Sequence, residues 1–492
     1  MNNNILYDEQ AIDLIYQGID KVKKTIVKTL GPNGKNVLIG KKYNNLIIND
    51  GYTIINNITS DNYYERIGIN ICKSIVRRIN DTVGDGTTSS IIIFSEILKK
   101  GIEKIKENIS VLSIIEYLNN SLEILLNEID KYSKSITINN IEQVLITSTK
   151  EQNIINNVKN AYVLVKEEGI ILLKETNGID YIEQNNGYFI LLKSQYNKTI
   201  LNDYQVLLLN DYIDSISCFS KVLKEDKKII FLVKDASNEV INFFKLYNEK
   251  NGSARLFIIN QSISEINSIF EDLSYLLNIK VCYKELIDIN YLSDKVKLIL
   301  DKDKLVFNLT SSILIDKLKD ELKETTSLVK RKQIKNRLAK LTNGFVSIYV
   351  GGNTLEEQHY KLLKYEDTIK TGYNALTEGI VIGGGYIYYK LANKLDNIYI
   401  NILKEALMMP IIQLLKNNNE DVEKILNQLN DYNWYDPIKK EVVNINQFNI
   451  YDATKTIKEI LKVSISNVVM LLNTTAVIIN QEESDYSIDN LL

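Results

Sequence analysis

The stretch NDTVGDGTTSS, residues 80–90, restricts the fold of this chain more than any other short segment. A helical pattern begins at its row of hydroxyl residues, so the Gly-Asp-Gly segment around Asp85 is expected to form a tight turn into a helix N-terminus. The free N–H groups and the positive dipole end of such a helix bind phosphate, and a neighbouring carboxylate suits Mg²⁺. The alternative is a simple N-cap, in which Thr87 or Thr88 completes the helix after a glycine turn.

Three other glycine-containing stretches are less specific by themselves. KTLGPNGKNVLIG (28–40) lacks the lysine followed by Ser or Thr of a Walker A motif, so it disfavours a P-loop NTPase and, taken alone, predicts a helix end followed by a hairpin turn. IINDGYTI (47–54), with Asp50 before a glycine, also predicts a hairpin turn when taken alone. EGIVIGGGYIYYK (378–390) places three glycines at the start of an expected helix. These glycines would allow either the close approach of a ligand or tight packing against another helix.

Length and composition indicate a globular protein of two or three domains. The chain has 492 residues, of which 45% are hydrophobic and 25% are charged. The formal net charge is only -3, and the two signs are mixed along the chain, so no basic face predicts nucleic-acid binding.

The cysteines and the single histidine argue against several kinds of site. Cys72, Cys218 and Cys282 are far apart and show no paired spacing, which predicts buried thiols in a reducing compartment and no disulfide framework. His359 lies in the polar run EEQHYK, which is typical of a solvated helix face. A histidine-based catalytic triad or a His/Cys zinc site is therefore disfavoured.

The sequence predicts no membrane association. No run of about 18 uncharged apolar residues occurs. The first residues enter a helical pattern without the basic and then apolar order of a secretion signal. We expect a bacterial cytoplasmic protein or, alternatively, one inside an organelle such as the plastid stroma or the mitochondrial matrix.

The two ends of the chain have helical patterns, and the middle is mixed. Apolar positions at helical spacing occupy 8–30, 87–131 and 453–474. In the middle, the apolar runs 229–235 and 256–261 flank a helical pattern, which is the signature of an α/β unit.

A lysine-rich segment and several glycines mark further boundaries. Residues 317–341 predict a charged helical hairpin or one long helix, ending at the C-cap signal Asn343-Gly344. Gly187, Gly344 and Gly379 fall between blocks and serve either as hinges or simply as ends of elements.

Taken in order, the glycine-containing motifs resemble one family. The series LGPNGKNV, NDGYTI, NDTVGDGTTSS, EGIVIGGG and YDATK is similar to the group I chaperonins, the GroEL-like ATP-driven folding machines. In those proteins the corresponding runs read close to LGPKGRNV, KDGVTV, NDAAGDGTTT, EGVVAGGG and LDPTK. The resemblance spans the whole chain but is strong only in its terminal thirds, and the apical PGFGDRR-like run of the family has no counterpart here.

The resemblance implies a multi-domain α and α/β fold, the chaperonin fold. A mainly helical equatorial ATPase domain would comprise 1–131 and 380–492. A small α/β intermediate domain would comprise 132–187 and 344–379, and an α/β apical domain that binds clients and a lid would comprise 188–343. Family members assemble as rings of seven, which requires heterologous contacts between neighbouring subunits.

The same resemblance implies an ATP site with Mg²⁺ and K⁺. Asp85 would bind Mg²⁺, backbone oxygens near Thr29 and Asn49 would hold K⁺, and Asn49 replaces the usual lysine of the family. Asp50 and Asp367 correspond to the carboxylates that orient the attacking water, although Asp367 taken alone predicts a charged surface position. The expected nucleotide contacts also include Leu30, Gly31, Pro32, Gly86, Thr87, Thr88, Ser89, Gly384, Asp452 and Asp436, the last of which stands where the family has asparagine near the adenine.

Two apolar stripes at helical spacing occur in the expected apical domain. They comprise Ile216, Phe219 and Leu223, and then Val240, Phe243, Phe244 and Tyr247. Such stripes ordinarily form core. In the chaperonins, two apical helices at about these places instead form a groove for non-native chains and the lid, which makes Phe219, Leu223, Val240, Phe243 and Phe244 expected client-binding residues.

Two functional hypotheses follow from the resemblance. The first is an ATP-dependent chaperone that encloses non-native proteins in a ring, with unfolded clients and a GroES-like co-chaperonin as partners. The second is a divergent chaperonin-like subunit with an assembly or interaction role and with reduced ATPase or folding activity.

Overall fold

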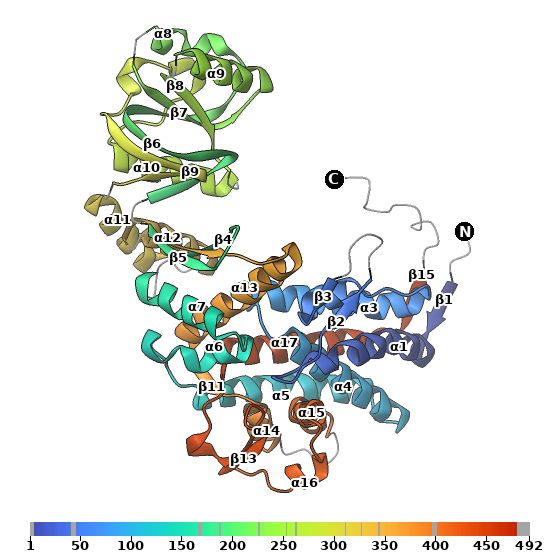
Figure 1. Cartoon of the computed structure of the whole chain (residues 1–492). Helices are drawn as coiled ribbons and strands as arrows, with labels where there is room; N and C mark the ends of the chain where they lie inside the picture. Colours follow the sequence, from blue (N-terminus) through green and yellow to red (C-terminus); the bar gives the residue numbers. More distant parts are fainter. Residues whose placement is uncertain are drawn as a thin grey trace. The chain divides into compact units, whose positions relative to one another are not determined.

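The computed structural model describes residues 4–479, apart from the segments 41–45, 166–169, 186–187, 225–226, 252, 261–262, 310, 326, 343–344 and 396–400. Within these residues the chain forms two compact units (Figure 1). Unit 1 comprises Met1–Asn160, Glu175–Tyr181 and Tyr349–Leu492, and unit 2 comprises Ala161–Lys174 and Ile182–Ile348.

Unit 1 is built around one buried helix, α4 (Thr87–Lys106), of which twelve residues are buried. It packs against α1 (Asp8–Ile26), α3 (Tyr63–Thr82), α15 (Ile402–Asn417) and α17 (Thr454–Leu472). A fully apolar stretch such as IIIF at 91–94 suits this position, because neighbouring helices cover the helix on several faces. The helical patterns predicted at both ends of the chain are confirmed.

Further helices and four short strand pairs complete unit 1. The other helices are α2 (Gly51–Asn56), α5 (Val111–Tyr132), α6 (Glu142–Ser148), α7 (Gln152–Val165), α13 (Leu355–Glu378), α14 (Tyr386–Ala392) and α16 (Val422–Leu426). Four antiparallel strand pairs accompany them: β1 (Asn4–Tyr7) with β15 (Ala476–Ile479), β2 (Val37–Ile39) with β3 (Leu46–Ile48), β11 (Ile380–Ile382) with β14 (Tyr451–Ala453), and β12 (Asn433–Asp436) with β13 (Glu441–Asn444).

Unit 2 contains a mixed four-stranded sheet in the order β8-β7-β6-β9. The strands are β6 (Tyr188–Ile213), β7 (Ile229–Ala236), β8 (Ala254–Ile258) and β9 (Val296–Phe307). β7 is parallel to β6 and β8, and α9 (Asn238–Asn251) connects β7 to β8, so the predicted α/β unit is confirmed. The unit also contains α8 (Ser220–Leu223), α10 (Ile263–Leu277), α11 (Ser312–Glu324) and α12 (Leu328–Thr342).

The lysine-rich segment 317–341 forms part of a helical hairpin, α11 followed by α12, rather than one long helix. Asn343, Gly344 and Gly187, named above as a cap and as hinges, lie outside the described residues.

A further, three-stranded sheet has the order β4-β10-β5. Its strands are β4 (Ile170–Glu175), β10 (Phe345–Val350) and β5 (Tyr181–Asn185).

The expected three-domain division stays a prediction, and its ranges fall within the two units as follows. Unit 2 contains the whole expected apical range 188–343, and unit 1 contains the expected equatorial segments 1–131 and 380–492. The separate intermediate domain stays a prediction. None of the helices in the described part of the chain combines the length and the apolarity needed to cross a bilayer.

The prediction of buried cysteines is confirmed for two of the three, and the prediction for the histidine is confirmed. Cys72 and Cys282 are buried, Cys218 is partly exposed, and all three are free thiols. His359 is exposed on α13, as a solvated helix face requires.

The expected client groove is wrong for three of its five residues. Phe219, Val240 and Phe244 are buried in a core cluster of unit 2 with strand residues such as Phe231, and the ring centroids of Phe219 and Phe244 lie 5.0 Å apart. Only Leu223 and Phe243 of the five are partly exposed. The stripes therefore face the sheet, because α9 and the short turn Ile216–Leu223 cover its apolar surface.

We predict that Phe244→Ser lowers the free energy of unfolding by about 3 kcal/mol or more, because it removes a buried ring and introduces a buried hydroxyl. Leu246→Ser is the matched control, since Leu246 lies on the same helix and is 59% exposed. Its effect should stay within about 0.5 kcal/mol. Denaturant unfolding of both variants measures the difference, and equal stabilities would contradict the core assignment.

Candidate functional site

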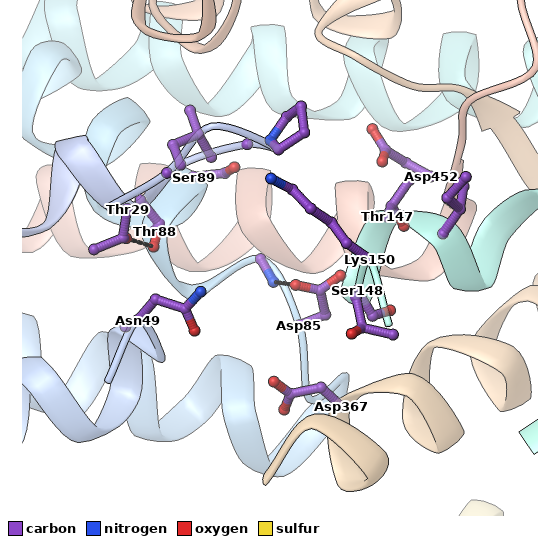
Figure 2. Close-up of a pocket in the computed structure, with 18 of the residues that line it drawn as sticks. Thr29, Asn49, Asp85, Thr88, Ser89, Thr147, Ser148, Lys150, Asp367 and Asp452 are labelled. Atoms are coloured by element: carbon purple, nitrogen blue, oxygen red, sulfur yellow. Dashed lines mark hydrogen bonds between the residues drawn. The ribbon is translucent and has the colours of Figure 1, made fainter. Parts of the chain in front are cut away.

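Unit 1 contains a pocket of about 620 Å³. Five chain segments form its walls, at 29–34, 49–51, 84–89, 146–152 and 384–385. Side chains from α7, α13, α14, α15 and α17, from the β12–β13 turn and from 450–452 complete them. All the predicted nucleotide, metal and catalytic residues except Asp436 line it. Figure 2 shows Asp85, Asp367 and Asp452 in the same pocket as Thr29 and Ser89.

The N-terminus of α4 forms one wall of this pocket. Gly84 and Gly86 have φ angles of +77° and +86°, which side chains other than glycine rarely adopt. Gly86 is the N-cap residue and no side chain caps this end, so the prediction of a threonine N-cap is wrong. The first-turn N–H groups are therefore left for a ligand, as the phosphate-site interpretation of GDGTTSS requires.

The loop that follows α1 lies against this helix end. Thr29 Oγ1 donates to the Ile26 carbonyl at 2.8 Å and lies 3.4 Å from Thr88 Oγ1. The amide of Asn417, at the end of α15, donates to the carbonyls of Val27 and Leu30 at 2.8 and 2.9 Å. Asn417 thus fixes the loop from a distant part of the sequence, and no local signal identified it.

Asp50 begins a helix and does not sit in a hairpin turn, so the local prediction for IINDGYTI is wrong. Its carboxylate accepts from the backbone N–H groups of Tyr52 (3.4 Å) and Thr53 (2.7 Å), which makes it the N-cap of α2. A Cβ atom on Gly51 would lie only 2.6 Å from Thr87 Oγ1. Glycine at this position lets the Asp50 turn approach the start of α4 closely.

Three carboxyl groups in the pocket have raised pKa values. Each side chain is only partly exposed to solvent, and the surrounding protein disfavours the ionised form. Burial is the main cause for Asp85 and for Asp367, whose pKa lies well above the usual range and is raised further by the charges of Asp50 and Asp85. Burial, followed by the charge of Asp85, raises the pKa of Asp452 to about 7.

Several buried polar atoms at this pocket lack a partner. Ten side-chain atoms in the described part of the chain are buried without a hydrogen bond, and four of them belong to pocket residues: Asn49 Oδ1, Ser148 Oγ, Tyr388 Oη and Thr456 Oγ1. Buried polar groups are normally paired, so this concentration indicates a site completed by a ligand or by water.

The residues present fit a magnesium nucleotide. Mg²⁺ usually takes one or two carboxylates and completes its coordination with water and phosphate oxygens. Asp85, beside the uncapped helix end, provides such a carboxylate. The described residues contain no cluster of three or more His, Cys, Asp or Glu side chains that would hold a metal without a ligand. The orphaned Asn49 Oδ1, near Thr29, adds an oxygen suited to a monovalent cation.

Asp436 does not belong to the pocket wall, contrary to its predicted contact with the nucleotide. Its buried carboxylate accepts from the backbone N–H groups of Ile438 (2.9 Å) and Lys439 (3.0 Å), and so holds the turn between β12 and β13. The neighbours Pro437 and Ile438 line the pocket instead.

Sequence reasoning missed one wall of the pocket. Thr147 and Ser148 are the last two residues of α6, Lys150 lies in the connection to α7 (Figure 2), and Tyr360 and Lys364 come from α13. The polar run TSTKEQ carries no motif, so only the fold brings it to the site.

The raised pKa of Asp452 predicts how stability changes with pH in the absence of ligand. Between its ordinary value of 3.8 and about 7, the folded chain keeps a proton that the unfolded chain has released. Stability should therefore fall as pH rises from 5 to 8, and Asp452→Asn should reduce this fall. Thermal unfolding in a metal-free buffer measures it, with the exposed Asp61→Asn as control. An unchanged pH profile in Asp452→Asn would contradict the raised pKa.

Comparisons with known proteins agree with this fold. A model of the TCP-1/cpn60 chaperonin family matches residues 22–181. Chaperonin GroEL 1 of Prochlorococcus marinus (strain MIT 9312) is 24% identical, with 99% of this chain and 90% of that protein covered. Two crystal forms of the chaperonin gp146 from the bacteriophage EL 2 (Pseudomonas aeruginosa), both in the presence of ATP-BeFx, match with TM-scores of 0.76 and 0.70 at 18% identity. Both matches cover 97% of this chain and 99% of the phage protein. The chain has the chaperonin fold, and the family match over 22–181 together with the full-length similarity to GroEL 1 supports a divergent GroEL-like chaperonin.

Proposed function

We propose that this chaperonin binds ATP with Mg²⁺ in the pocket of unit 1 and hydrolyses it to assist the folding of non-native proteins. The observation that carries the proposal is the uncapped N-terminus of α4, with Asp85 beside it and Asp367 in the same pocket. A related phage chaperonin was crystallised in the presence of ATP-BeFx, which supports the same class of ligand for this chain.

The side chains of the pocket divide into three groups under this proposal. Phosphate oxygens would accept from the first-turn N–H groups and hydroxyls of α4, and Asp85 would hold Mg²⁺. Bound Mg²⁺ supplies positive charge that stabilises the phosphate oxygens during transfer. Thr29 and Asn49 would border K⁺, and Gly384 and Asp452 would face the ribose.

Asp50 and Asp367 would position the attacking water. Their charges act on each other, as the effect of Asp50 on the pKa of Asp367 indicates. The carboxylate of Asp367 makes no hydrogen bond or ion pair with another described residue, so it is available to accept a hydrogen bond from water. Placement of the nucleophile is a large part of catalysis in phosphoryl transfer, which does not require a covalent intermediate.

We predict that Asp367→Ala binds ATP with nearly parental affinity but lowers kcat by at least about 100-fold, because the carboxylate acts on water rather than on the nucleotide. Glu366→Ala is the matched control, since Glu366 is exposed and pairs with Lys370 at 2.7 Å outside the pocket. Steady-state ATPase and equilibrium binding separate the two effects.

Two results would count against this assignment. If Asp367→Ala hydrolyses ATP with the kcat of the parental protein, Asp367 has no role in the reaction. A parental protein without ATPase activity would favour the second hypothesis, a chaperonin-like subunit with an assembly or interaction role.

We propose that the chain follows the three-domain plan of its family, with 132–187 and 344–379 as an intermediate domain and 188–343 as the apical client domain. Phe243 and Leu223 remain candidates for client contact because both are partly exposed, and the exposed Leu246 lies beside Phe243 on α9. Unfolded chains and a GroES-like lid are the proposed partners.

The bacterial origin of the related GroEL 1 favours a cytoplasmic location for this protein, with an organelle interior as the alternative.

Ring assembly is the proposed quaternary state, with seven subunits as in the family. Two of the four strand pairs of unit 1 are β1-β15 and β2-β3, and neither pairs with a third strand among the described residues. Leu38 and Ile47 are cross-strand partners on the β2-β3 hairpin, and they are 62% and 60% exposed. Open strand edges that carry exposed apolar side chains are suited to pairing with another subunit.

We predict that the double variant Leu38→Lys, Ile47→Lys dissociates the assembly, because it places two charges in an apolar contact between subunits. Leu112→Lys is the control, since Leu112 is 74% exposed at the start of α5. Mass photometry measures the particle mass of each protein. Rings of unchanged mass in the double variant would exclude this hairpin from the interface, and a monomeric parental protein would contradict ring assembly.

A further inference from the structure

Lys150 extends into the candidate nucleotide pocket from an unexpected segment. It lies in the short connection between α6 and α7, two residues before α7 begins. It lines the pocket, and Figure 2 shows its side chain reaching into the space between the labelled residues, toward the side with Thr29 and Ser89. The residue is exposed, so its ammonium group is free to contact a bound ligand.

The charges of the pocket distinguish Lys150 from the other cation there. Five acidic side chains line the pocket, namely Asp50, Asp85, Glu151, Asp367 and Asp452, against two basic ones, Lys150 and Lys364. Lys364 already acts on Asp85 and Asp367, where its charge favours their ionised forms. The Lys150 side chain makes no ion pair or hydrogen bond with any residue that the structure describes. It is therefore the cation of the pocket that remains available to an anion.

We propose that Lys150 binds the phosphate groups of the nucleotide and positions them against the N-terminus of α4. The inference rests on the proposed ATP site and adds a phosphate-binding residue to it. Apart from Lys150, the α4 side of the pocket offers neutral N–H and hydroxyl donors, whereas a nucleoside triphosphate brings several negative charges among five acidic side chains. An ammonium group there supplies a charge-assisted hydrogen bond and offsets part of the repulsion.

The proposed contact would also affect the connection between α6 and α7. Contact between Lys150 and the phosphates would fix the α6–α7 connection to the bound nucleotide, and Ser148, whose Oγ is orphaned, ends α6 just before this connection. Backbone amides of residues 147–151 should then exchange hydrogen more slowly when ATP is bound.

The test compares three substitutions by titration calorimetry with Mg·ATP and with adenosine. Lys150→Met keeps an unbranched apolar stem and removes the charge, Lys150→Arg keeps the charge, and Lys150→Glu reverses it. Lys159→Met is the control, because Lys159 lies on α7, outside the pocket, and pairs with Glu142 at 2.8 Å. Thermal unfolding without ligand checks that each variant is folded.

We expect Lys150→Met to weaken Mg·ATP binding about 10- to 100-fold and Lys150→Glu to weaken it further. Lys150→Arg and Lys159→Met should stay within about threefold of the parental affinity, and adenosine affinity should not change in any variant. ATP should protect the amides of 147–151 in the parental protein and not in Lys150→Met.

Parental ATP affinity in Lys150→Met would overturn the role of Lys150 while leaving the nucleotide site intact. An equal loss for ATP and adenosine would also overturn it, because a phosphate contact does not affect a nucleoside. Absence of ATP binding by the parental protein would overturn both this inference and the proposed function.

Discussion

The N-terminus of one buried helix is the constraint on which the site depends. Neighbouring helices hold α4 in the core of unit 1, and the uncapped end of the helix forms a wall of the pocket. Unpaired N–H groups at a fixed, partly buried position carry a free-energy cost unless a partner satisfies them. The two glycines at positive φ direct the chain into this helix end, and the loop after α1 and the Asp50 turn pack against it.

The same region concentrates other unfavourable features. Three carboxyl groups have raised pKa values, and four buried polar atoms lack a partner. A stable resting structure would normally avoid both, because isolated charges and unpaired polar groups are costly to bury. Mg²⁺ and phosphate oxygens would satisfy these groups together. Binding of such a ligand should therefore raise the free energy of unfolding of unit 1.

Local chemistry explains what the sequence could predict. The Gly-Asp-Gly turn into α4 and the glycines before α14 follow from backbone rules within a few residues, and both were correct. Asp367 was placed by family resemblance, since its own surroundings look like a solvated helix face. Asn417, which holds the loop after α1, and the pocket segment 147–150 were missed because only tertiary packing with distant parts of the sequence brings them to the site.

The errors have physical reasons of the same kind. Asp50 is the N-cap of α2 and does not form a hairpin turn. An aspartate before a glycine is compatible with both structures, and the close packing of Gly51 against the start of α4 decides between them. Phe219, Val240 and Phe244 form core because the sheet of unit 2 needs an apolar cover on this face. Periodicity alone does not state whether a stripe faces a sheet or a client. Asp436 has the right position in sequence, but its carboxylate is used by its own turn.

The most direct test of the account is a structure of the purified assembly with a non-hydrolysable ATP analogue and Mg²⁺, determined by electron cryo-microscopy. The account predicts phosphate density at the first turn of α4, a metal ion bound by Asp85, and the carboxylate of Asp367 facing the terminal phosphate. Nucleotide density elsewhere in the chain, or an empty pocket at saturating analogue, would contradict the assignment of this site.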